Sequence, residues 1–117
     1  MAGVEPLPKE EKLAFKVMLD SDEIGTLRAE EGEWLFSYSD EFQKQTEIKP
    51  IANFPDVKRQ YRNRSLWPFF ALRIPSPEQP AVREFIRKLP HKKPDEGILL
   101  KEFGERTIAN PFRLVPV

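Results

Sequence analysis

The sequence contains no cysteine and only one histidine, His91, and these two scarcities exclude several kinds of site. A chain without thiols has no disulfide framework, no cysteine nucleophile and no thiolate ligand for a metal ion. One imidazole cannot supply the clustered nitrogen ligands of a zinc site. His91 stands in a Pro-His-Lys-Lys-Pro segment, which is typical of an exposed loop. We therefore expect no metal centre and no cofactor.

Long apolar runs are also missing. No stretch of the chain approaches the roughly 18 apolar residues that a membrane-spanning helix needs. The first twelve residues, MAGVEPLPKEEK, lack the apolar core of a secretion signal. A length of 117 residues suits one domain. We expect a flexible tail over residues 1–12, a single domain over residues 13–117, and a cytoplasmic protein with no membrane partner.

Catalytic motifs are absent as well. The chain has no G-x-S-x-G elbow, no P-loop and no kinase signature for magnesium or for a catalytic base. The acidic group Asp20, Asp22 and Glu23 is too short for a calcium loop, and it fits a hairpin turn better. The sequence therefore predicts a protein that is not an enzyme.

Three segments near the N-terminus alternate apolar and polar residues with the period of a β-strand: residues 13–19, 23–29 and 33–39. Turn residues separate them, so the three segments predict an antiparallel meander. Gly25 inside the second segment indicates a bulge or a close backbone approach. A fourth segment, residues 48–54, contains Pro50 and is followed by Pro55. Because proline cannot donate to a central ladder, this segment is predicted to be an edge strand or irregular chain.

The rest of the chain predicts short helices and a last strand. Their proposed capping residues are Ser39 or Asp40, Ser65, Ser76 (with Gln79 as a capping box) and Asp95, and Gly104 is expected as a left-handed C-terminal cap. Residues 110–117 predict a closing strand. The fold class is therefore α+β: a small antiparallel sheet, partly barrel-like, with two or three short helices packed on one side.

Charge is segregated along the chain although the net charge is zero. Acidic residues dominate residues 20–47, and basic residues dominate residues 58–93. Such halves could orient a partner, or they could be ordinary solvated faces. Two basic clusters, residues 58–64 and 87–93, leave a small nucleic-acid-binding or transcription-associated protein as an alternative. A sequence pI of about 6.6 argues against direct nucleic-acid binding.

A series of short motifs points to a family. In order they are IGTL (24–27), WLFSY (34–38), the proline-flanked stretch 50–55, PFF (68–70) and LLKEFGERT (99–107). Together they resemble the N-terminal subdomain of HipA-type serine/threonine kinases, the toxins of bacterial toxin–antitoxin modules, from about residue 13 to residue 116. Two places depart from the family pattern: residues 71–75 replace a leucine-rich turn, and residues 109–112 replace a Gly-Ala pair.

The resemblance implies a function, because the chain carries this subdomain without a kinase body. It is similar to the HipS component of three-part HipBST modules. This implies an antitoxin-like, non-catalytic protein that docks on a HipA-like kinase lacking its own N-terminal subdomain and restrains it, with a helix-turn-helix protein as a further component. An interaction module unrelated to toxin control remains a second alternative.

The aromatic block LWPFFALRIP (66–75) supplies the candidate contact residues. Phe69 and Phe70 fit core positions on a short helix. Trp67 could project into the kinase as an interface anchor, or it could be another core aromatic. We place four residues around Trp67 in the first case: Tyr61, Arg62, Arg64 and Arg73.

Overall fold

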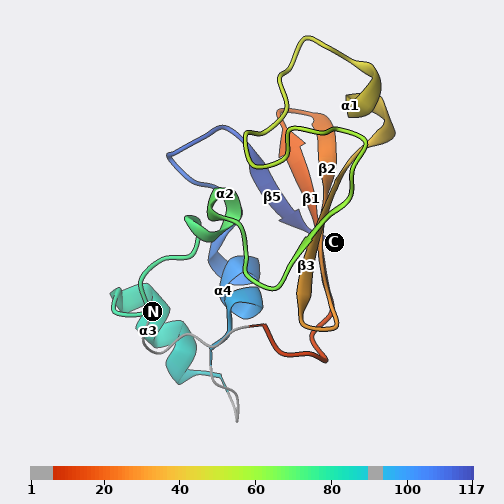
Figure 1. Ribbon diagram of the computed structural model, residues 1–117. Coiled ribbons are helices and arrows are strands. Elements are labelled where there is room, and N and C mark those ends of the chain that lie inside the picture. The colour runs from red at the N-terminus through yellow and green to blue at the C-terminus, as the bar shows by residue number, and fades with distance from the viewer. Residues whose placement is uncertain (1–6, 90–93) are drawn as a thin grey trace.

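The computed structural model describes residues 7–89 and 94–117, and its centre is a five-stranded antiparallel sheet in the order β4-β3-β2-β1-β5 (Figure 1). The strands are β1 (Leu13–Leu19), β2 (Asp22–Glu30), β3 (Glu33–Tyr38), β4 (Tyr61–Asn63) and β5 (Arg113–Pro116). The predicted meander corresponds to β1, β2 and β3 and is confirmed. The sheet is open, with β4 and β5 as its edges, so it does not close in the barrel-like way that we expected.

Two tight turns join the meander strands. Glu31 and Gly32 both have positive φ, at 52° and 78°, which is the backbone that a two-residue hairpin of type I′ needs. Asp20, in the first turn, also has a positive φ of 55°. Short polar residues and glycine adopt this conformation most readily, which explains the turn signals in the sequence.

Gly25 lies where β2 bulges against β1. Val17 pairs with Gly25 and Met18 pairs with Glu23, so Ile24 has no partner in the ladder. A Cβ atom on Gly25 would collide with the carbonyl oxygen of Ser37 on β3. Both halves of the prediction for Gly25, a bulge and a close backbone approach, are therefore confirmed.

We expect Gly25→Ala to lower the free energy of unfolding by about 2–3 kcal/mol, because the new methyl group forces β2 away from β3. Urea unfolding followed by circular dichroism measures this loss. Thr26→Ala is the matched control, since Thr26 is only partly buried and the change alters mainly its strand preference. Equal losses in the two variants would contradict the steric explanation.

Four helices, rather than two or three, accompany the sheet in the described residues: α1 (Asp40–Lys44), α2 (Pro68–Ala71), α3 (Pro80–Arg87) and α4 (Glu96–Phe103). Figure 1 places α2, α3 and α4 on one side of the sheet. Two predicted caps are confirmed. The Ser39 hydroxyl accepts from the backbone N–H of Phe42 at 3.1 Å, and the Asp95 carboxylate accepts from that of Ile98 at 3.0 Å.

The caps predicted for α2 and α3 are wrong. Trp67, not Ser65, is the N-cap of α2, and Gln79 is the N-cap of α3; neither makes a side-chain cap bond. The Ser76 hydroxyl accepts from the N–H of Glu78 instead, in a local turn. Proline begins both helices, and its fixed φ starts a helix where no side chain caps it.

One further expectation fails for a geometric reason. Gly104 has a φ of −92°, so it is not a left-handed cap. It is confined instead by space, because a Cβ atom there would collide with the carbonyl oxygen of Leu100. Residues 48–54 are irregular, which is one of the two alternatives given for this segment, and the edge strand β4 lies within the basic cluster 58–64.

The core lies between the sheet and the helices. It is rich in aromatic side chains, and Phe15, Trp34 and Phe36 have no exposed surface. The indole of Trp34 donates to the Glu96 carboxylate at 3.3 Å, which ties β3 to the first turn of α4. Leu7 is buried too, so packed chain extends before residue 13, while residues 1–6 of the expected tail lie outside the described residues. No helix in the described ranges has the length and apolarity to span a membrane.

Candidate partner-binding site

Phe54 is the centre of an aromatic cluster that brings two of the predicted contact residues together. Its ring is fully buried and stacks on Phe36, with 4.3 Å between centroids. Tyr61 and Trp67 both meet Phe54 in edge-to-face geometry, each with 5.0 Å between centroids. Two residues from separate elements, β4 and the start of α2, therefore share one support.

Phe54 is held in place although it belongs to no helix or strand. The Tyr38 hydroxyl donates to the Phe54 carbonyl oxygen at 2.7 Å and accepts from the N–H of Ile51 at 2.8 Å. Burial raises the pKa of Tyr38 to about 12, and the bond from Ile51 partly offsets this. One buried hydroxyl on β3 thus fixes the irregular segment that carries Phe54.

We expect Tyr38→Phe to lower the free energy of unfolding by about 1–3 kcal/mol, because two buried backbone groups lose their partner. The pKa of Tyr38 is higher in the folded than in the unfolded chain. Its contribution is therefore complete below about pH 10 and is lost as the pH rises through about 12. The variant should lose stability less steeply over that interval in urea titrations.

Tyr61→Phe is the matched control for this prediction. The Tyr61 hydroxyl bonds only the backbone of exposed Asp56, so its removal leaves no buried group unpaired. A loss in Tyr38→Phe no larger than that in Tyr61→Phe would contradict the proposed role of the buried hydroxyl.

Trp67 is partly buried. Its burial is therefore intermediate between the two alternatives that the sequence left open, an exposed interface anchor and a core aromatic. One edge of the indole packs on Phe54. Its backbone carbonyl accepts from the N–H groups of Phe70 and Ala71 at 2.9 and 2.8 Å, so the first turn of α2 fixes its position. Only a minor part of the Trp67 surface remains exposed. Trp67 is therefore supported by the core and is also available for contact.

The arginines do not gather around Trp67 as we expected. Arg62 follows Tyr61 on β4 and points to the opposite face of the sheet, where it pairs with Glu33 at 3.2 Å. Arg64 is exposed and lines a shallow hollow together with Glu31 and Glu33. Arg62 and Arg64 are thus surface cations, and Arg62 lies on a different face of the sheet from the aromatic cluster.

Arg73 is not at the surface: only 4% of it is exposed. Its guanidinium donates to the Phe112 carbonyl oxygen and to the Asn110 side chain, both at 3.0 Å. Burial lowers the pKa of Arg73 to about 10. Arg73 therefore joins the end of α2 to the segment before β5, a role that its position in an apolar block did not indicate.

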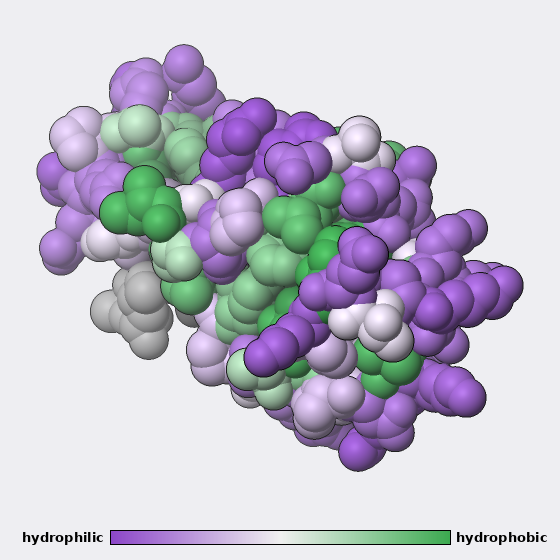
Figure 2. All heavy atoms as spheres, turned by 90° about the horizontal axis from the view of Figure 1, so that it is seen from above, coloured by the Kyte–Doolittle hydropathy of each residue, from purple (hydrophilic) through white to green (hydrophobic). Residues whose placement is uncertain are grey.

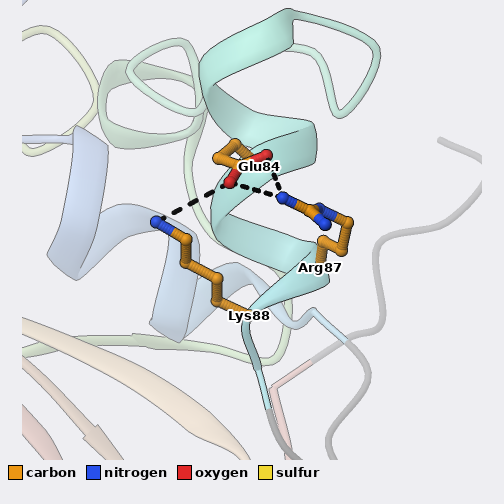
Figure 3. Close-up of polar contacts among 3 residues, drawn as sticks. All are labelled: Glu84, Arg87 and Lys88. Atoms are coloured by element: carbon orange, nitrogen blue, oxygen red, sulfur yellow. Dashed lines mark hydrogen bonds and ion pairs between the residues drawn. The ribbon is translucent and has the colours of Figure 1, made fainter.

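Residues of both basic clusters already have contacts within the chain. The Arg59 guanidinium lies over the Tyr61 ring at 5.2 Å, and this ring also packs on Phe54. On α3, Glu84 pairs with Arg87 at 2.7 Å and with Lys88 at 3.7 Å (Figure 3). Residues 90–93 of the second cluster lie outside the described residues. These contacts do not favour the stacking and phosphate binding that a nucleic-acid site requires.

Sequence reasoning missed Phe54 and Tyr38 as supports of the site. Their link depends on two positions 16 residues apart that meet only in the folded chain, and no local pattern marks it.

Seen from above, the molecule shows apolar side chains gathered between charged rims (Figure 2). No group of three or more acidic, His or Cys side chains in residues 7–89 and 94–117 is arranged to hold a metal ion.

Comparison with known proteins gives one family. No curated protein and no solved structure matches the chain significantly. The family model described as the HipA N-terminal domain matches residues 15–109, which run from β1 to the turn before β5. Because this match covers most of the 117 residues, the chain belongs to the HipA N-terminal domain family.

Proposed function

We propose that this protein is a non-catalytic, antitoxin-like protein of the cytoplasm that docks on a HipA-like serine/threonine kinase and restrains it. The observation that supports the proposal most directly is the family match over residues 15–109. A domain of this kind lies beside a kinase body in HipA-type proteins, so a kinase that lacks its own copy offers a complementary surface. A helix-turn-helix protein is a further expected component.

The contact residues follow from the aromatic cluster. We propose that Trp67 is the anchor, because a partly exposed indole held by a buried support loses little side-chain freedom on binding. Tyr61 shares that support and stabilises it. Arg62, on the opposite face of the sheet, and Arg64, beside the turn between β2 and β3, remain proposed contacts. Arg73 acts indirectly by holding the end of α2.

The experiment uses a HipA-like kinase that lacks its own N-terminal subdomain, as the proposal requires. The two proteins are purified separately, their affinity is measured by calorimetry, and kinase autophosphorylation is measured with and without this protein. We expect a stable complex and reduced phosphorylation. A kinase that does not bind overturns the proposal, and a kinase that binds but is unchanged overturns the restraining role.

A further inference from the structure

A hollow of about 590 Å³ lies between the turn that joins β1 to β2 and helix α1, both at the top of Figure 1. Residues from 21–24 and from 41–48 line it, so two segments that are separate in the sequence form its walls. Binding sites for ligands have volumes of roughly 300–1,000 Å³. The hollow is therefore large enough to receive a side chain of a partner.

The most buried residues that line the hollow are apolar. They are Ile24 and Phe42, which are buried, and Ile48, which is partly buried. Ile24 is the residue that the bulge of β2 leaves without a partner on β1. These three side chains, which we call the apolar floor, offer a surface to the aliphatic part of a ligand.

The hollow keeps its shape through hydrogen bonds that join its walls. The Ser39 hydroxyl donates to the Glu23 carbonyl oxygen at 2.9 Å, and the N–H of Ser39 donates to the Ile24 carbonyl oxygen at 2.8 Å. The Gln45 side chain accepts from the N–H of Ile48 at 2.8 Å and donates to its carbonyl oxygen at 2.9 Å. A site that is formed before binding loses less conformational freedom when a ligand enters.

Every charged residue that lines the hollow is acidic. These residues, which we call the acidic rim, are Asp22, Glu23, Glu41 and Glu47, and all four are exposed. Glu23 pairs with Lys16 at 3.6 Å. No other carboxylate of the rim takes part in an ion pair among residues 7–89 and 94–117. The rim is therefore complementary to a cation.

The same side chains do not suit a bare metal ion. No three acidic, His or Cys side chains in the part of the chain that the structure describes are close enough to ligate one. The apolar floor would also give nothing to a hydrated ion. A lysine or arginine side chain fits both surfaces, because its stem packs on apolar groups while its charged end stays near water and carboxylates.

We propose that this hollow is a binding site for a lysine or arginine side chain presented by a segment of a partner protein. Small-molecule sites usually enclose most of their ligand, whereas this hollow has exposed walls, so a side chain delivered from another protein surface is the fitting occupant. The inference goes beyond kinase docking through Trp67, since it uses other residues and assigns a ligand chemistry to the acidic segment 20–47.

The test uses amide NMR spectra of the full chain and a capped hexapeptide with one arginine between leucines. We expect saturable shifts at Ile24, Phe42 and Ile48. The same peptide with citrulline in place of arginine should bind about fivefold more weakly, because citrulline keeps the stem and loses the charge. Equal affinities for the two peptides would overturn the role of the acidic rim.

Three variants of the protein test the two surfaces separately. Glu41→Gln and Ile48→Ala should each weaken binding of the arginine peptide about 2–3-fold, the first through charge and the second through lost apolar contact. Glu102→Gln is the control for charge, since Glu102 is an exposed carboxylate on α4 that does not line the hollow. The NMR spectra also show whether each variant is folded.

The remaining outcomes would each contradict the proposal. An equal loss in Glu102→Gln and Glu41→Gln would show general charge attraction without a site, and an unchanged Ile48→Ala would remove the apolar floor. Free agmatine that binds as tightly as the arginine peptide would make the occupant a small cation. Self-association that Glu41→Gln abolishes would make it a second copy of this chain.

Discussion

Replacing Trp67 with alanine is expected to weaken binding of the HipA-like kinase about 30-fold or more. Buried interface tryptophans typically lose 2 kcal/mol or more of binding free energy when truncated, and 1.4 kcal/mol corresponds to a tenfold change in affinity. Trp67 meets the structural condition for such an anchor, since Phe54 supports one edge of the indole and part of the residue stays exposed. Calorimetry with the purified kinase measures the loss.

Trp67→Phe separates the anchor from the packing. A phenylalanine keeps an aromatic edge against Phe54 but offers a smaller surface to the partner, so we expect an intermediate loss. Both variants need a check of unfolding in urea, because the contact with Phe54 also stabilises the fold. Affinities within twofold of the unmodified protein for both variants would show that Trp67 serves only the core. Trp67 emission can also be measured in the isolated protein with Trp34 replaced by phenylalanine. Emission that is strongly blue-shifted and protected from quenchers would likewise show that Trp67 serves only the core.

Phe54→Ala is expected to lower the free energy of unfolding by about 3–5 kcal/mol. Its fully buried ring contacts four aromatic neighbours, namely Phe36, Tyr61, Trp67 and Phe70, so truncation leaves a cavity that cannot easily collapse. Domains have a total stability of about 5–15 kcal/mol, so the loss is a large part of it. Urea unfolding measures the change, and Trp67 fluorescence should shift to longer wavelength as its support disappears.

Ile108→Ala is the control for Phe54→Ala, because the Ile108 side chain is fully exposed. We expect a change of no more than about 0.5 kcal/mol. A loss below about 1 kcal/mol for Phe54→Ala would contradict the central position that we give this ring. If Phe54→Ala protein that is still folded binds the kinase more weakly, then Phe54 supports the proposed contact residue Trp67.

Local patterns predicted the parts of the fold that local chemistry determines. The meander follows from period-two alternation between turns, and Ser39 and Asp95 cap their helices because their oxygens reach N–H groups three residues later. The starts of α2 and α3 were harder. There proline sets the backbone, and a nearby serine resembles a cap without acting as one.

The candidate site was predictable only in part, because long-range contacts define it. Trp67 and Tyr61 were expected together, and they do share Phe54. Arg62 was expected beside them, but alternation along β4 turns it to the other face. Arg73 looked like a surface cation, yet its partners Asn110 and Phe112 lie almost forty positions along the chain. No spacing rule reveals a contact of that range.

The pairing of β5 with β1 has a consequence for how the domain is made. Phe15 pairs with Pro116 and Val17 with Leu114, so the first and last strands are neighbours in the sheet. During translation, β1, β2 and β3 can form their hairpins early, but β1 keeps an open edge until residues 113–116 have left the ribosome. A nascent chain stalled before Arg113 would therefore present an unpaired strand to chaperones and proteases.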